Sequence, residues 1–168
     1  VGLLTVQVLK AAGAIVTALD IRSESLELAK SFGADYVYDT SKKDFIDYLL
    51  SITGGIGHDI VFETAGAQNA PKISIDITRR GGKTILVGIY SKELTMNFND
   101  IVFFEKEVIG AIGSSPGDME AAAMLLNQGK IDPSSLVSDT IKLDNVVKDG
   151  YEKMNSNSRN IFRILVSP

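Results

Sequence analysis

The sequence predicts an α/β protein built on a doubly wound parallel sheet. Short apolar segments alternate with amphipathic segments through about residue 129, and the expected helical crossovers are long enough to join parallel strands. Several apolar segments are continuous rather than alternating, which is typical of strands covered on both faces. Right-handed crossovers would bring the carboxyl ends of these strands to one edge, outside which such sheets bind ligands.

The first elements are predicted from the signals at their ends. The residues after Gly2 favour a helix that stops at Gly13, and the next apolar run ends on Asp20. Ser23 can cap a second helix, and Gly33 supplies its stop. The expected helix, strand, helix and strand span residues 3–12, 15–20, 23–32 and 36–38.

The middle of the chain repeats this order. Ser41 and Asp44 resemble a capping box, which predicts a helix that Gly54 breaks. Pro71 suits the first turn of another helix, which the pair Gly81-Gly82 would end. Strands are expected at residues 59–64, 84–88 and 108–113, and helices at residues 45–52, 71–80 and 119–128.

The alternation does not continue cleanly after Asp132. A strand at residues 141–143, a helix around residues 145–154 and a last strand at residues 161–166 are expected there. We therefore expect one domain over residues 1–129 and a segment, residues 130–168, that belongs structurally to a neighbouring domain.

Composition excludes several classes of function. The net charge of −4 and the pI near 5.0 argue against a nucleic-acid or anionic-membrane partner. No apolar run is long enough to cross a bilayer, and no signal peptide is evident, so we expect a cytoplasmic protein. Cysteine is absent and His58 is the single histidine, which excludes disulfides and argues against a zinc site or a catalytic constellation within this chain.

One helix start and one strand end together suggest a dinucleotide site. Unpaired N–H groups at a helix N-terminus favour a phosphate pair, and an acid at the end of the next strand can accept hydrogen bonds from ribose hydroxyls. Asp20 follows Gly2 by 18 positions, close to the roughly 20 positions expected between the glycines of G-x-G-x-x-G and its acid. Only the last glycine of that motif is present, so the first strand is missing or lies upstream.

The ends of the later strands carry glycines that would let a flat ligand approach the backbone closely. These ends are Thr64, Ala65 and Gly66; Val87, Gly88 and Ile89; and Ala111, Ile112 and Gly113.

Several residues also have simpler interpretations. Asp20 could cap a helix entry, and Glu63 could be a structural hydrogen-bond acceptor or a cofactor contact. His58 is expected to be a surface residue, and Arg79-Arg80 is expected to complement a helix C-terminus. The glycines of residues 54–57 lack a following Lys-Ser/Thr, which favours an ordinary break over a second phosphate loop.

An ordered set of segments runs along nearly the whole chain: VGLLTVQVLKAAGA, VTALD, LAKSFGAD, GGIGHDIVFETAG, RRGGKTILVGIY, EKEVIGAIGSS and IFRILVSP. This set resembles the Rossmann cofactor domain of the medium-chain dehydrogenases. It is most similar to the zinc-containing alcohol, sorbitol, threonine and sugar-phosphate alcohol branch. The resemblance therefore implies a nicotinamide dinucleotide as ligand.

The resemblance implies a role for each candidate residue. Gly2 and Leu3 match the start of the helix under the pyrophosphate, and Asp20, flanked by Ile21 and Arg22, matches the acid on the adenosine ribose. The charge of Asp20 would repel a 2′-phosphate, so NAD is expected rather than NADP. The remaining matches are Thr64, Ala65 and Gly66 beside the adenine-side ribose; Val87, Gly88, Ile89, Ala111, Ile112 and Gly113 around the nicotinamide; and Arg163 on the pyrophosphate.

The chain departs from the family at Ser25, where many relatives have Lys or Arg. Arg22 could substitute there, which leaves room for NADP. Arg22 and Arg163 could also each be surface charge.

The resemblance further implies that zinc and the alcohol substrate are bound by a catalytic domain outside this chain. The parent protein would oxidise a secondary alcohol of a polyol or sugar-related substrate, and it would be a homodimer or homotetramer paired through the strand near residues 108–112. The alternatives are a zinc-independent NADPH quinone or enoyl reductase, against which Asp20 argues, and a non-catalytic NAD-binding module.

Overall fold

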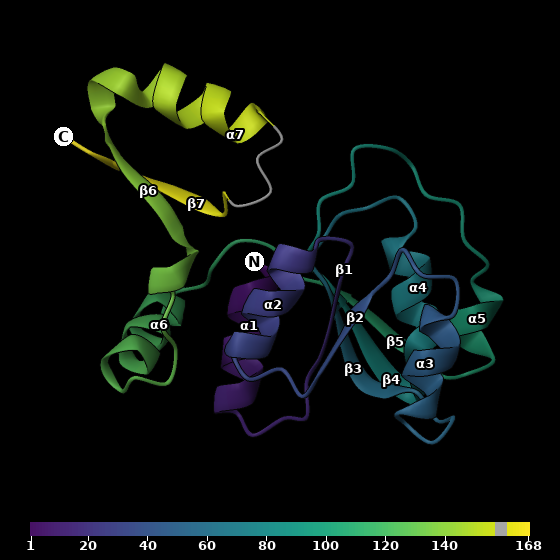
Figure 1. Ribbon diagram of the computed structural model, residues 1–168. Helices are drawn as coiled ribbons and strands as arrows, with labels where there is room; N and C mark the ends of the chain where they lie inside the picture. Colours follow the sequence, from purple (N-terminus) through teal and green to yellow (C-terminus); the bar gives the residue numbers. More distant parts are fainter. Residues whose placement is uncertain (157–160) are drawn as a thin grey trace. The chain divides into compact units, whose positions relative to one another are not determined.

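The computed structural model describes residues 1–156 and 161–168, and it has the predicted α/β class with parallel strand pairing (Figure 1). The chain divides into two compact units. The first unit comprises residues 1–2 and 40–119, and the second comprises residues 3–39 and 120–168. Each unit is described separately below.

The second unit begins with a helix–strand–helix–strand run, as the sequence predicts. Its elements are α1 (Gly2–Ala11, whose first residue belongs to the other unit), β1 (Thr17–Asp20), α2 (Ser23–Ser31) and β2 (Tyr36–Asp39). Strand β1 pairs with β2 in parallel, and Asp20 lies opposite Asp39. Val6, Val16, Ala29 and Ala34 form the buried core between these elements.

Lys10 and Asp35 fix the ends of the elements in this run. The Lys10 ammonium donates hydrogen bonds to the Ala14 carbonyl at 2.9 Å and to the Asp35 carboxylate at 2.8 Å. The same carboxylate accepts the Val16 N–H at 2.7 Å, so the end of α1 is tied to the segment that enters β1. Both predicted glycine stops are confirmed, with φ values of 82° at Gly13 and 92° at Gly33.

The rest of the second unit contains another parallel strand pair. Its elements are most of α6 (Asp118–Asn127), then η1 (Ser134–Leu136), β6 (Val137–Lys142), η2 (Leu143–Asn145), the π-helix η3 (Val146–Glu152), α7 (Lys153–Asn155) and β7 (Arg163–Ser167). Strand β6 starts four residues earlier than predicted. Most of its first residues are exposed, so the sequence there has only a weak apolar pattern, and the predicted strand begins too late. Gly150 of η3 packs against Ile141 of β6, where an added Cβ would lie 3.3 Å from the Ile141 Cδ1 atom.

The first unit holds a three-stranded parallel sheet in the order β3-β4-β5. Its elements are α3 (Phe45–Ser51), β3 (His58–Glu63), α4 (Ala70–Ile77), β4 (Thr78–Leu86), α5 (Asn99–Val102) and β5 (Glu107–Gly110). Among the described residues, β1 and β3 each have one strand neighbour. Within the part of the chain that the structure describes, the parallel strands therefore form separate groups, β1-β2, β3-β4-β5 and β6-β7.

The predicted helix through Arg80 is wrong, because α4 ends at Ile77. The Thr78 hydroxyl donates to the Ser74 carbonyl at 2.7 Å and lies 2.9 Å from the Thr84 hydroxyl, which favours an extended Thr78. The interpretation of the arginine pair as a helix C-terminal complement is also wrong. Arg79 pairs with Asp59 at 2.6 Å and Arg80 with Glu105 at 2.9 Å, so both bridge to other segments.

Two further predictions for this unit are not met. The capping box is wrong, since Asp44 directly precedes α3 and its side chain makes no capping hydrogen bond. Among residues 1–156 and 161–168, nothing covers both faces of strand β3, because Ile60 is 51% exposed and Phe62 is 36% exposed. These two side chains share one face of the strand, and α4, the helix that packs on β3, can cover only one face.

Candidate functional site

The three strands of the first unit end in step. In the sheet register, Glu63 at the end of β3 lies opposite Leu86 of β4, and Leu86 lies opposite Gly110 at the end of β5. The three predicted strand-end segments, residues 64–66, 87–89 and 111–113, therefore leave the sheet at one edge (Figure 1). This is the edge at which parallel α/β sheets bind ligands.

Glu63 organises this edge. Its side chain is 3% exposed, and its Oε1 atom accepts the N–H groups of Ala65 at 2.8 Å and Gly66 at 2.9 Å. Its backbone carbonyl accepts the N–H groups of Val87 at 2.8 Å and Gly88 at 3.0 Å. Of the two interpretations that the sequence left open, the structure gives Glu63 the role of a structural acceptor that joins two loops.

Tyr90 is a further residue of this edge, and the sequence analysis missed it. Its hydroxyl donates a hydrogen bond to Oε2 of Glu63. The pKa of Tyr90 is raised above its ordinary range, first by burial and then by the hydrogen bond and negative charge of Glu63. The available signal was a hydroxyl-bearing aromatic two positions after the strand-end Gly88.

The glycines of the two joined loops are required by loop packing. Gly66 has φ of +65°, and an added Cβ would lie 2.5 Å from the Ile89 carbonyl oxygen. A Cβ on Gly88 would overlap both the Glu63 carboxylate and the Gly66 backbone. Gly113 differs, because its φ of +69° requires glycine although nothing lies within 4 Å of its Cβ position.

The start of α1 contributes Gly2 to the same unit. An added Cβ on Gly2 would lie 2.8 Å from the Thr64 hydroxyl oxygen, so the helix start fits closely against the turn after β3. The first turn of this ten-residue helix contains no acidic residue. Its N–H groups are thus not opposed by a local negative charge, which suits an anion.

Asp20 ends β1 in the second unit. Its Oδ1 atom accepts the N–H groups of Ile21 at 2.8 Å and Arg22 at 3.0 Å, so it does hold the turn into α2. In the described part of the chain, the hydrogen bonds of its carboxylate all use this oxygen. The side chain is 33% exposed, which leaves the second carboxylate oxygen available to a ligand hydroxyl.

Arg22 lies beside Asp20 and is held by an aromatic ring. Its guanidinium carbon is 5.3 Å from the centre of the Phe162 ring, and its Nε atom is 3.8 Å from Oδ1 of Asp20. Phe162 directly precedes Arg163, the exposed first residue of β7. The ring was missed by sequence reasoning, although it belongs to the closing segment IFRILVSP.

The predicted residues thus fall into two groups, one in each unit. The first unit brings together Gly2 and the three strand-end segments, and the second unit brings Asp20, Ile21 and Arg22 next to the Phe162-Arg163 pair. Leu3 follows Gly2 in α1 and is half-buried.

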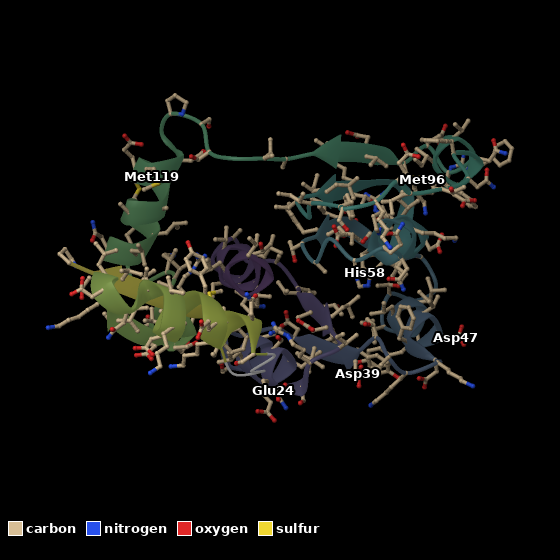
Figure 2. All side chains as sticks on the ribbon, turned by 90° about the horizontal axis from the view of Figure 1, so that it is seen from above. Glu24, Asp39, Asp47, His58, Met96 and Met119 are labelled. Atoms are coloured by element: carbon tan, nitrogen blue, oxygen red, sulfur yellow. The ribbon has the colours of Figure 1, made fainter. Side chains whose placement is uncertain are left out.

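His58 is not the surface residue that we predicted. It begins β3 (Figure 2) and is half-buried, and its Nε2 atom is buried without a hydrogen-bond partner among residues 1–156 and 161–168. The pKa of His58 is lowered because burial penalises the charged ring, an effect that the nearby Asp59 charge opposes.

No group of three or more His, Cys, Asp or Glu side chains in the described residues could hold a metal ion, so these residues do not fit a zinc site.

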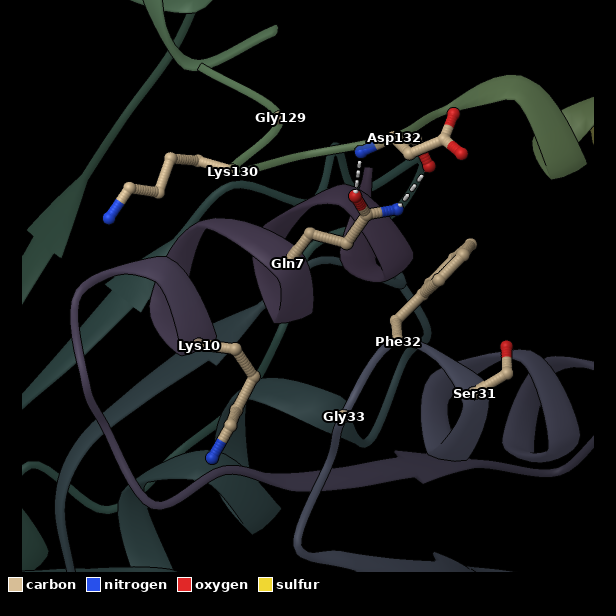
Figure 3. Close-up of a pocket in the computed structure, with 8 residues that line it drawn as sticks. All are labelled: Gln7, Lys10, Ser31, Phe32, Gly33, Gly129, Lys130 and Asp132. Atoms are coloured by element: carbon tan, nitrogen blue, oxygen red, sulfur yellow. Dashed lines mark hydrogen bonds between the residues drawn. The ribbon is translucent and has the colours of Figure 1, made fainter.

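A separate pocket of about 450 Å³ lies within the second unit (Figure 3). Gln7 closes one side, since its amide exchanges two hydrogen bonds with the backbone of Asp132, at 2.8 and 2.6 Å. The lining residues are Gln7, Lys10, Ser31, Phe32, Gly33, Gly129, Lys130 and Asp132. None of the predicted cofactor residues is among them.

Within the described chain, no helix has the length and apolar character needed to span a membrane.

Comparison with known proteins identifies the family. Residues 1–128 match the family model described as "Zinc-binding dehydrogenase". The chain is 37% identical over 141 residues to a sorbitol dehydrogenase of Halalkalibacterium halodurans, covering 82% of this chain and 41% of that protein. It is 30% identical over 163 residues to an NAD-dependent alcohol dehydrogenase of Sulfurisphaera tokodaii, covering 95% of this chain and 46% of that protein.

A solved structure supports the same assignment. The crystal structure of 2R,3R-butanediol dehydrogenase from Bacillus subtilis matches with a TM-score of 0.89 and 31% identity, over 99% of this chain and 47% of that one. The chain belongs to the zinc-binding dehydrogenase family, which confirms the resemblance and the predicted fold class. It spans about half the length of the relatives that it matches.

Proposed function

We propose that this chain is the NAD(H)-binding domain of a zinc-dependent oxidoreductase that oxidises a secondary alcohol of a polyol or sugar-related substrate. The observation that carries the proposal is the sheet edge where β3, β4 and β5 end in step beside the start of α1. The printed names of the relatives, sorbitol dehydrogenase and NAD-dependent alcohol dehydrogenase, support the same class of cofactor and substrate.

The first unit supplies the pyrophosphate and nicotinamide contacts. The N–H group of Gly2, at the start of α1, binds the pyrophosphate. Leu3 and Arg163 belong to the second unit, and their pyrophosphate contacts stay predictions from the resemblance. The backbone of residues 64–66 borders the adenine-side ribose, and the backbones of residues 87–89 and 111–113 hold the nicotinamide ring and its carboxamide. A nicotinamide dinucleotide held there would supply the hydride acceptor for the alcohol, and the backbones of residues 87–89 and 111–113 would fix the orientation of its ring.

The second unit selects the cofactor. The free carboxylate oxygen of Asp20 accepts a hydrogen bond from an adenosine ribose hydroxyl, with Ile21 and Arg22 beside it. Its charge disfavours the 2′-phosphate of NADP. Arg22 does not reverse this preference, because its guanidinium is held over Phe162 and next to Asp20.

The other parts of the parent protein complete the enzyme. Zinc and the alcohol are bound by a domain outside this chain, and residues 130–168 return toward that domain from the nucleotide-binding domain of residues 1–129. The parent is cytoplasmic and forms a homodimer or homotetramer through the exposed edge of β5, where Val108 is 36% and Ile109 is 41% exposed.

A nucleotide titration of the intact parent protein tests the cofactor assignment. Wild type is expected to bind NADH at least tenfold more tightly than NADPH, and Asp20→Asn is expected to lose about tenfold in NADH affinity because a charge-assisted hydrogen bond is removed. Asp39→Asn is the matched control, since Asp39 is the register partner of Asp20 on the neighbouring strand. A wild-type preference for NADPH would contradict the assignment and favour the quinone or enoyl reductase alternative.

Metal analysis and turnover of the same protein test the enzyme assignment. One bound zinc with reduction of NAD by a polyol is expected. Turnover without zinc would support the zinc-independent reductase, whereas NADH binding without turnover on a panel of polyols and sugar alcohols would support the non-catalytic module.

A further inference from the structure

One buried carboxylate connects two loops of the proposed nicotinamide edge. Oε1 of Glu63 accepts the N–H groups of Ala65 and Gly66, while Oε2 accepts the hydroxyl of Tyr90. The backbone carbonyl of the same residue accepts from Val87 and Gly88. The loop after β3 and the loop after β4 are therefore both bonded to a single side chain and its backbone.

The Tyr90 hydroxyl is difficult to replace by water. Glu63 is 3% exposed, and its Oε2 atom lies against Gly88, where even a Cβ atom would overlap it. The phenol also stays protonated in neutral solution, since burial and the Glu63 charge raise the pKa of Tyr90. The Tyr90 hydroxyl is thus a permanent donor to an oxygen that little solvent can reach.

We infer that Glu63 and Tyr90 form a positioning pair that sets the loop of residues 87–90 against the loop of residues 64–66, and so orients the backbone that holds the nicotinamide ring. This inference rests on the proposed function for the identity of the ligand. Neither side chain is a catalytic residue, because both act through the backbone that they hold.

The positioning role predicts that substitution of Tyr90 weakens binding of the nicotinamide half of the cofactor and leaves binding of the ADP-ribose half unchanged. In Tyr90→Phe, the Glu63 oxygen loses its donor and the loop of residues 87–90 is released, while the bonds from Ala65 and Gly66 remain. NADH affinity should fall about tenfold, the size expected for one buried charged hydrogen bond, whereas ADP-ribose affinity should change less than twofold. A purely structural role would weaken both ligands together.

Glu63→Gln provides an independent test. The carboxamide oxygen can accept from Ala65 and Gly66, and its NH₂ group can donate to the Tyr90 oxygen. Both loops then stay bonded to residue 63 without charge, with the direction of the bond to Tyr90 reversed. NADH affinity is therefore expected to stay within about threefold of wild type. A tenfold loss in this variant would mean that the negative charge, rather than the positioning, matters, and would overturn the inference.

The measurement is isothermal titration calorimetry of the intact parent protein with NADH and, separately, with ADP-ribose. Tyr36→Phe is the matched control, because Tyr36 begins β2 in the other unit and is not among the predicted cofactor residues. If wild type binds neither ligand, the proposed function fails. If wild type binds both and Tyr90→Phe behaves like wild type, or loses both ligands equally, the positioning role fails while the proposed function stands.

Discussion

The crowding at Gly66 gives a quantitative prediction for the stability of the proposed site. Gly66 and Gly81 have the same left-handed backbone, with φ of +65° at both, and both belong to the first unit. A Cβ on Gly66 would lie 2.5 Å from the Ile89 carbonyl oxygen, whereas a Cβ on Gly81 would meet nothing closer than the Arg79 Nη1 atom at 3.7 Å. Comparing alanine at the two positions therefore separates the steric clash from the backbone strain.

The two substitutions should differ clearly. The left-handed conformation costs an alanine about 1 kcal/mol at either position. At Gly66, displacement of the Ile89 backbone adds roughly 2 to 3 kcal/mol. For a domain of this size, about 2 to 4 °C of Tm is lost per kcal/mol, so Gly66→Ala should lower Tm by about 6 to 16 °C and Gly81→Ala by about 2 to 4 °C.

Thermal unfolding of the intact protein, followed by far-UV circular dichroism without cofactor, measures both variants. The reasoning is refuted if the two alanine variants lose the same stability, since the Ile89 carbonyl would then not constrain residue 66. A Gly66→Ala protein as stable as wild type would refute the left-handed backbone as well.

Two other predictions concern acid stability and assembly. Burial lowers the pKa of His58 below its ordinary value of 6.5, so the unfolded chain binds a proton more readily than the folded chain. The stability that neutral His58 contributes is therefore complete above pH 6.5 and is lost as the pH falls below 6.5. Tm measured from neutral pH to about pH 5 should therefore fall less steeply in His58→Leu than in wild type, and parallel slopes would contradict this. Light scattering of the intact protein should give at least a dimer, and Ile109→Lys, which places a charge on the exposed β5 edge, should lower the mass; a monomeric wild type would remove the basis for that interface.

Much of the fold could be predicted because its signals are local. Gly13 and Gly33 stop their helices with positive φ as expected, and Asp20 ends the first strand. The helix predicted through Arg80 fails because the competing contacts are distant in sequence. Arg79 and Arg80 pair with Asp59 and Glu105, and no local pattern specifies such partners.

The backbone segments of the candidate site could be predicted from the sequence, but its side-chain contacts could not. Strand ends can be located from apolar runs followed by glycine, which is how residues 64–66, 87–89 and 111–113 were found. Tyr90 and Phe162 were missed because their roles depend on which loop lies beside them: Tyr90 on the Glu63 carboxylate and Phe162 under the Arg22 guanidinium. His58 was misjudged because a loop-to-strand position in sequence does not reveal how deeply a side chain is packed.

The dependence of two loops on Glu63 limits how this domain can be re-engineered. Exchanging only residues 64–66, or only residues 87–90, with those of a relative would leave one side of the shared carboxylate without its matching donors. A transplant that preserves cofactor geometry must carry both loops together with residue 63. Sequence variation in one loop of a functional homologue should accordingly be accompanied by compensating variation in the other.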